Sequence, residues 1–202
     1  MNYLALDTSN KNLTVVIEYD GKREIYFDPE AGTEHSVAVM NKIEECAEKI
    51  SADFKKMDFF AVVTGAGSFT GIRIGVSTIK AMCFAFNKPC LNITSFDEIA
   101  YNNLSGKVMA VIDALHNSVY VCGYDQGKVV FPPRFISVTE LSELVKEYTL
   151  LSFQNIAGVN SRIVPIDEGL IKAVRALKEN ATFDYDKIFP LYVRKSQAEE
   201  GR

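Results

Sequence analysis

One pattern occurs twice in this chain of 202 residues: an apolar strand that ends in Asp, then a second strand and a tight turn. In the first copy the strand ends at Asp7 and the turn closes at Gly21. In the second copy the strand ends at Asp113 and the turn closes at Gly127, so the spacing is 14 residues both times. Internal repetition of this kind predicts a duplicated α/β domain in which each half opens with a β-hairpin.

Three helices are predicted between the copies, the third beginning near Ser95, and the first two differ in character. The first begins after the predicted N-cap Thr33 and has apolar residues at helical spacing as far as Ile50. The second, from about Thr70 to Phe86, carries apolar side chains all round, which indicates burial on more than one side. It is therefore either a central core helix or part of a contact with a partner. The second half has no clear counterpart of it, so we predict a reduced second domain.

The composition and motifs of the chain argue against several functional classes. The formal net charge is −4, so the chain lacks the basic excess that is typical of a stand-alone nucleic-acid binder. No stretch approaches the ~18 apolar residues of a membrane span, and no signal peptide is recognisable. The four cysteines form no CxxC pair, which favours free thiols in a reducing cytoplasm. No HExxH, HxxxH or GxSxG pattern occurs, and neither His35 nor His116 predicts a metal or catalytic site.

The turns of the two hairpins are the first candidates for a phosphate site. The first, residues 7–10 (Asp7, Thr8, Ser9 and Asn10), has hydroxyl groups but no glycine. It could bind a nucleotide phosphate, but polar caps at a strand end are the favoured interpretation. The second turn contains Leu115 and is a poorer candidate.

A glycine-rich segment connects a predicted strand to the second helix. Residues 65–75 read GAGSFTGIRIG and lack the Lys-Ser/Thr pair of a Walker A loop. The helix start at Ser68 and Thr70 could bind an anion. We favour a capped, tight connection whose glycines let a neighbouring chain come close.

These segments resemble those of a known family. GAGSFTGIRIG is similar to the signature GPGSFTGxRxG of the bacterial TsaB (YeaZ) family, and the resemblance extends to 6–9 (LDTS), 35–36 (HS) and 190–194 (PLYVR). It implies a duplicated actin-like (ASKHA, RNase H-like) fold with an N-terminal lobe over 1–104 and a reduced C-terminal lobe over 105–202. The departures are Ala66 for Pro, Leu115 for Arg and Val193 for Leu, and residues 94–99 lack the metal-binding histidines of the sister enzyme TsaD.

The resemblance also implies a function. TsaB proteins take part in making N6-threonylcarbamoyladenosine at position 37 of tRNAs that read codons starting with A (ANN codons). The implied role is a non-catalytic scaffold that binds a TsaD-like catalytic subunit and a TsaE-like ATPase, or forms a homodimer when alone. The complex rather than this subunit would use ATP, no cofactor would be tightly bound here, and tRNA contact would be indirect.

The implied partner interface uses the first two helices. It comprises apolar and glycine residues at the following positions: Val37, Met40, Ile43, Gly67, Phe69, Gly71, Ile72, Ile74, Val76, Ile79 and Met82. Some of these must face the sheet instead. On this assignment, replacing Ile79 or Ile74 by Glu should abolish pairing.

Two other functional classes remain open. A metallopeptidase, as in the glycoprotease grouping once given to this family, needs a metal or a nucleophile. A small-molecule kinase of the actin-like superfamily needs tight nucleotide binding.

Overall fold

The computed structural model describes residues 1–31 and 35–194, and the predicted N-cap Thr33 lies outside them. Contacts divide the chain into two units. Unit 1 contains Met1–Thr94 and Val174–Leu191, whereas unit 2 contains Ser95–Ala173 and the described residues 192–194. The sequence-based boundary between 104 and 105 falls later in the chain than this division. It also did not anticipate that the chain returns to unit 1 near its C-terminus.

Unit 1 contains a five-stranded mixed sheet in the order β3-β2-β1-β4-β5. The strands have these bounds: β1 Tyr3–Asp7, β2 Leu13–Tyr19, β3 Lys22–Asp28, β4 Phe59–Val63 and β5 Cys90–Ile93. β1, β2 and β3 form an antiparallel meander, and β4 and β5 continue the sheet in parallel with β1. β1 and β4 are buried along their whole length, as expected for strands that are covered on both faces.

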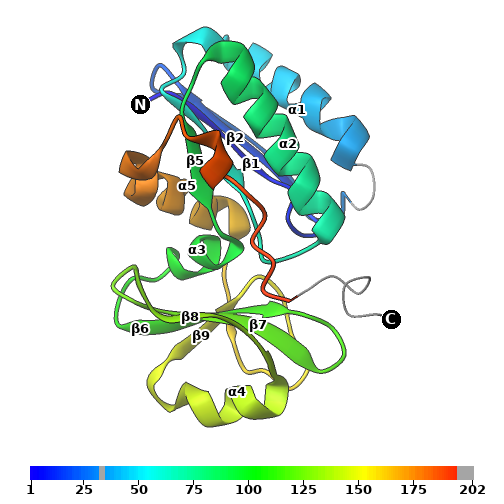
Figure 1. Ribbon diagram of the computed structural model, residues 1–202, viewed down its shortest axis with the longest axis vertical. Coiled ribbons are helices and arrows are strands. Elements are labelled where there is room, and N and C mark those ends of the chain that lie inside the picture. The colour runs from blue at the N-terminus through cyan, green and yellow to red at the C-terminus, as the bar shows by residue number, and fades with distance from the viewer. Residues whose placement is uncertain (32–34, 195–202) are drawn as a thin grey trace. The chain divides into compact units, whose positions relative to one another are not determined.

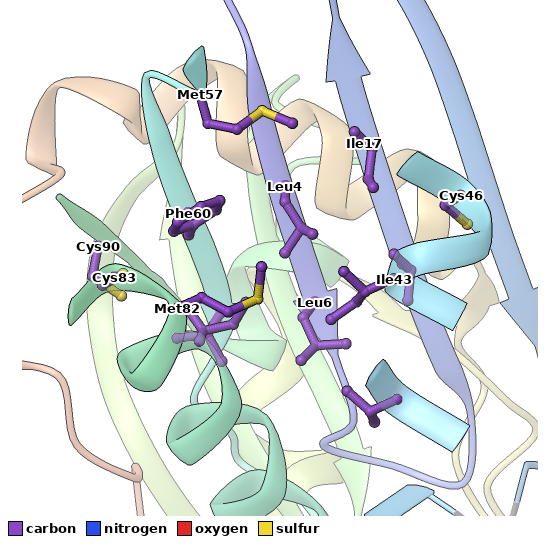
Figure 2. Close-up of a cluster of buried hydrophobic side chains, with 14 of the residues drawn as sticks. Leu4, Leu6, Ile17, Ile43, Cys46, Met57, Phe60, Met82, Cys83 and Cys90 are labelled. Carbon is purple, nitrogen blue, oxygen red and sulfur yellow. The ribbon is translucent and has the colours of Figure 1, made fainter. Parts of the chain in front are cut away.

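Two long helices lie side by side on one face of this sheet (Figure 1). α1 (His35–Ile50) packs on β2 and β3, and α2 (Phe69–Phe86) packs on β4 and β1. Figure 2 shows the core between the helices and the strands, with Leu4 and Leu6 of β1 facing Ile43 of α1 and Met82 of α2. The core therefore accounts for one side of the apolar second helix.

α2 is also long and apolar enough to cross a membrane, by length and composition alone. The sequence-based expectation that no stretch reaches this threshold was therefore too strict. The buried side of α2 packs into the core of unit 1.

Unit 2 repeats the topology of unit 1. Its sheet has the order β8-β7-β6-β9-β10, which matches β3-β2-β1-β4-β5 strand for strand. The strands have these bounds: β6 Lys107–Asp113, β7 Ser118–Asp125, β8 Lys128–Ser137, β9 Thr149–Ser152 and β10 Arg162–Ile163. The predicted duplication of an α/β domain is thus confirmed.

The helices of unit 2 show how its fold is reduced. α4 (Val138–Leu144) follows β8 as α1 follows β3, and it packs on one face of the sheet. α3 (Ser95–Ala100) covers the other face, where Tyr124 donates a 2.8 Å hydrogen bond to Asp97. Between β9 and β10 there is only a connection without a helix, at the place where α2 stands in unit 1. The predicted loss of the second helix is confirmed.

Four short 3-10 helices and α5 (Ile166–Leu177) complete the described elements. The 3-10 segments have these bounds: Phe54–Lys56, Val145–Glu147, Lys178–Asn180 and Tyr185–Lys187. The first two thirds of α5 belong to unit 2, and its last turn, from Val174, belongs to unit 1. All four cysteines are free and buried, as predicted, and burial raises the pKa of Cys46 to about 11.

The carboxylate of Glu18, on β2, binds the segment of residues 174–191 to the sheet of unit 1. Glu18 accepts hydrogen bonds from Arg23 of β3 and, at 3.2 Å, from Arg175 near the end of α5. Tyr3 donates a longer one of 3.5 Å. Burial opposes the ionisation of Glu18, but the hydrogen bonds from Arg23 and Arg175 outweigh it, and the pKa is held below its ordinary value of 4.5.

This arrangement predicts a pH-dependent stability. Because the pKa of Glu18 is lower in the folded state, its contribution is complete above pH 4.5 and is lost as pH falls through the folded pKa. Glu18→Gln should lower the free energy of unfolding by about 1–2 kcal/mol near pH 7. Urea unfolding from pH 3 to 7 should show the gap to wild type closing at low pH. A gap that stays constant would mean that the charge of Glu18 is not what matters.

Candidate partner-binding site

Three of the sequence motifs meet at one end of the sheet in unit 1. The turn after β1 lies against the start of α2, where Ser68 donates its backbone N–H to the carbonyl of Ser9 at 2.6 Å. Thr8 donates its hydroxyl to the carbonyl of Gly71 at 2.7 Å. The 190–191 segment joins the same end, because Leu191 donates its N–H to the carbonyl of Thr64 at 2.7 Å. The LDTS motif, the glycine-rich segment and the start of PLYVR therefore form one packed cluster.

The glycines of this cluster permit a very close approach. A Cβ on Gly71 would overlap the carbonyl oxygen of Thr8, and one on Gly67 would overlap that of Ser9. A Cβ on Gly75, one turn further along α2, would lie 2.5 Å from the Thr8 hydroxyl. The favoured interpretation of the segment, a capped connection with closely approached glycines, is confirmed, and Ser68 is the cap. The segment that comes close is the 8–10 turn of the same chain.

This packing occupies the predicted nucleotide site. Asp7, Thr8 and Ser9 are completely buried. The Asp7 carboxylate accepts hydrogen bonds from the backbone N–H of Ser9 at 2.7 Å and from the amide of Asn12 at 2.8 Å. Asn10, which is half-buried, donates to the Ser9 hydroxyl at 3.0 Å. Nucleotide binding here stays a prediction, but this arrangement favours the alternative interpretation of the turn as a polar strand-end cap.

The second hairpin turn is shaped by local backbone geometry. Leu115, His116 and Asn117 all have positive φ angles, of 63°, 50° and 59°. The N–H of Leu115 bonds the Asp113 carboxylate at 2.8 Å, and the side chains of Leu115 and His116 are exposed. Among the described residues, no three His, Cys, Asp or Glu side chains come together to hold a metal ion. The side chain of His35 lies outside the described part.

Seven of the eleven predicted interface residues are taken up by contacts within unit 1. Five of them lie on the sides of α1 and α2 that face the sheet, and they are buried in the core of unit 1: Ile43, Ile72, Val76, Ile79 and Met82. Gly67 and Gly71 pack closely against the turn of residues 8–10. The cause is the helical period, because apolar residues three and four positions apart share one face and that face packs on the sheet.

A smaller set of predicted residues remains on the outside. Met40 of α1 is 44% exposed, Phe69 at the start of α2 is also exposed, and Ile74 is half-buried. The side chain of Val37 lies outside the described part of the chain.

Two further exposed residues of α2, Arg73 and Phe84, were omitted from the prediction. Phe84 is 70% exposed, and its ring packs edge-on against Tyr185 with centroids 4.7 Å apart. The Arg73 guanidinium lies 3.8 Å from the centre of the Phe69 ring. The helical period could have identified both, because positions 73 and 84 lie opposite the buried stripe that includes 72, 75 and 79. We define the outer face as Met40, Phe69, Arg73, Ile74 and Phe84.

A glycine substitution would test the packing of α2 on the turn. Gly75→Ala should lower the free energy of unfolding by about 1–3 kcal/mol, since the new methyl group meets the Thr8 hydroxyl and overpacking outweighs the gain in helix propensity. Thr8→Ala removes that hydroxyl. In the double variant much of the cost of the alanine should disappear, and urea denaturation of all four proteins gives the coupling. Strictly additive effects would contradict the packing described here.

A second pair of variants separates the core from the outer face. Ile79→Ala should cost about 2–5 kcal/mol of unfolding free energy, because Ile79 is completely buried. Phe84→Ala should cost less than about 1 kcal/mol, because most of that ring is already in contact with water. Ile79→Glu would therefore report on folding rather than on pairing. Equal costs in thermal or urea unfolding would show that the two sides of α2 are wrongly assigned.

Comparisons with known proteins bear on the identity of the chain. The family model described as "TsaD: tRNA N6-adenosine threonylcarbamoyltransferase" matches residues 28–163, about two thirds of the chain. The Haemophilus influenzae tRNA threonylcarbamoyladenosine biosynthesis protein TsaB is 29% identical over 133 residues, which cover 64% of this chain and 56% of that protein. The Bacillus subtilis protein of the same name is 26% identical over 153 residues, or 73% of this chain and 67% of that protein. This chain thus matches little more than half the length of the Haemophilus relative.

The fold agrees with the same assignment. YeaZ from Pseudomonas aeruginosa superposes with a TM-score of 0.79, covering 95% of this chain and 99% of that one at 18% identity. The similarity at this identity concerns the fold alone. The match to the family model shows that this chain belongs to the TsaD-type family that the model describes, and the curated relatives to which it is similar are TsaB proteins.

Proposed function

We propose that this protein is a non-catalytic binding subunit in the synthesis of N6-threonylcarbamoyladenosine on tRNA. One observation carries the proposal. The residues that would form a phosphate site, Asp7, Thr8 and Ser9, are buried against the start of α2, whereas apolar side chains of the same helix stand exposed to water. The motif residues thus stabilise the helix, and the helix presents a surface.

The exposed part of α2 and α1 has the character of a contact surface. Phe84 and Met40 are large apolar residues, and Phe69 is stacked with a cationic side chain. Aromatic, Met and Arg side chains are enriched in protein interfaces, so exposed side chains of these types are suited to a contact with a partner. Burying them is worth about 25 cal/mol for each Å² of apolar area removed from water.

The family gives the proposed partners. The curated relatives are named for threonylcarbamoyladenosine biosynthesis, and the matching family model is named for the transferase TsaD. A TsaD-like subunit would occupy the outer face and carry out the transfer. A TsaE-like ATPase would use ATP within the complex, no cofactor would stay tightly bound to this chain, and tRNA contact would be indirect. We place the complex in the cytoplasm and expect the free chain to be able to form a homodimer.

The proposal is tested in cells that need this protein to modify their tRNA. After the cells are depleted of the protein, a plasmid supplies the wild-type protein, the double variant Met40→Asp/Phe84→Asp, or the control variant Leu144→Asp. Leu144 is a comparable exposed residue, 40% accessible, on α4 of unit 2. Mass spectrometry of tRNA nucleosides should find the modified adenosine restored by wild type and by the control, but at most about a tenth of it with the double variant.

The purified proteins give the matching physical measurement. Light scattering should detect a one-to-one complex of the chain with the TsaD homologue of the same organism, and the double variant should not form it. Full modification without this chain would contradict the proposal. Tight ATP binding by the chain alone in calorimetry, or zinc-dependent proteolysis, would instead revive the kinase or the peptidase alternative.

A further inference from the structure

β3 is an open edge of the sheet in unit 1. It pairs with β2 on one side, and no strand in the described part of the chain pairs with its other side. Such an edge presents unpaired N–H and C=O groups, which can pair with another strand. Ile25 and Phe27 lie two residues apart, and therefore on the same face of the sheet, and they are 37% and 43% exposed. The edge of unit 1 thus offers both backbone groups and apolar side chains.

The matching edge of unit 2 is protected, whereas this one is not. β8 takes the place of β3 in the second sheet, and it contains Pro132 and Pro133, which have no N–H group to donate. Its pairing with β7 is also interrupted by register shifts. Prolines and irregularities of this kind keep edge strands from associating. β3 contains no proline, and its pairing with β2 runs without a shift from Lys22 to Asp28.

The two ends of β3 carry opposite charges. Inside the strand, the charges of Arg23 and Glu24 are neutralised by ion pairs with side chains of β2 and α1. Lys22 and Asp28 are the first and last residues of the strand, and among the residues that the structure describes they form no ion pair. The Asp28 carboxylate accepts a hydrogen bond of 3.0 Å from the exposed N–H of Glu30. Both charges are therefore available to another molecule.

Two copies of this strand can pair with each other in a favourable register. Copies related by a two-fold axis perpendicular to the sheet lie antiparallel, and residues of the same face meet. With Ile25 on the axis, Lys22 of each copy lies opposite Asp28 of the other. Arg23 then meets Phe27, whose ring attracts a guanidinium group. All seven residues of the strand are paired in this register.

The neighbouring registers bring like charges together. With Glu24 on the axis two carboxylates meet directly, and with Tyr26 on the axis Glu24 lies opposite Asp28. Like charges directly opposite each other in an antiparallel pair are destabilising. Both registers also leave part of each strand unpaired. The sequence of β3 is therefore complementary to itself in the register that pairs its whole length.

We infer that two copies of this chain associate through β3, antiparallel and with Ile25 at the two-fold axis, so that one sheet continues through both copies. The inference goes beyond the proposed function, because it uses none of the residues that form the outer face. The contact is one short strand from each copy, so the dimer should be weak and should depend on protein concentration.

Two charge variants test the register. Lys22→Asp and Asp28→Lys each place like charges opposite each other at both ends of the paired strands. Sedimentation equilibrium from about 10 µM to about 1 mM should find that each variant alone associates at least about tenfold more weakly than wild type. An equimolar mixture of the two variants should associate about as strongly as wild type, because the new aspartate of one meets the new lysine of the other. This restoration is expected only if position 22 of one copy lies opposite position 28 of the other.

A matched control uses the protected edge. Lys128→Asp makes the same substitution at the first residue of β8, and it should leave self-association unchanged. The melting temperature of every variant should stay within a few degrees of that of wild type, because these substitutions lie outside the core and Asp28→Lys removes a hydrogen bond to an exposed N–H.

Three results would overturn the inference. They are a wild-type chain that stays monomeric at the highest concentration, a dimer that neither charge variant weakens, and a mixture that does not restore association. None of them bears on the proposed function, which is decided by binding of the TsaD homologue. Lys22→Asp should still bind that homologue, and a wild-type chain that dimerises but does not bind it would contradict the proposed function alone.

Discussion

The close packing of α2 on the turn after β1 is the contact on which the rest of unit 1 depends. Gly71 and Gly75 bring the helix backbone against Thr8, and the Thr8 hydroxyl bonds the Gly71 carbonyl. Side chains at these two positions would hold the helix away from the sheet. The inner side of α2 could then not reach Leu6 and the other buried residues of β1 and β4. A contact between backbones therefore determines where the largest apolar helix of the chain lies.

The same contact changes what the first hairpin turn can do. A turn that binds phosphate must offer its N–H groups and hydroxyls to a ligand. Here Ser9 and Thr8 direct theirs to Asp7 and to α2, and the whole stretch from Asp7 to Ser9 is buried. In a fold that is duplicated strand for strand, the second turn has lost the matching helix altogether, because nothing corresponds to α2 between β9 and β10. The two copies have thus diverged most after the fourth strand of each sheet, counted along the chain.

Much of this architecture could be predicted because local patterns in the sequence indicate it. Two strands that end in Asp7 and Asp113, each followed by a hairpin, were enough to predict the duplication. The glycines at 67, 71 and 75 indicated a close approach, but not which segment would come close, because that depends on pairing between β1 and β4. The return of residues 174–191 to unit 1 had no local signal. It depends on long-range contacts such as that between Glu18 and Arg175.

The second helix shows why the interface was harder to predict than the fold. An apolar residue on a helix is equally consistent with a sheet below and a partner above, so composition alone could not separate Ile79 from Phe84. The helical period distinguishes Ile79 from Phe84 once one position of the helix is known to be buried. Gly71 and Gly75 identify the buried side, since only the side that faces the Thr8 turn requires glycine. Arg73 and Phe84 then fall on the opposite side, where an aromatic ring and a stacked guanidinium add little to the core and are typical of a surface that another molecule covers.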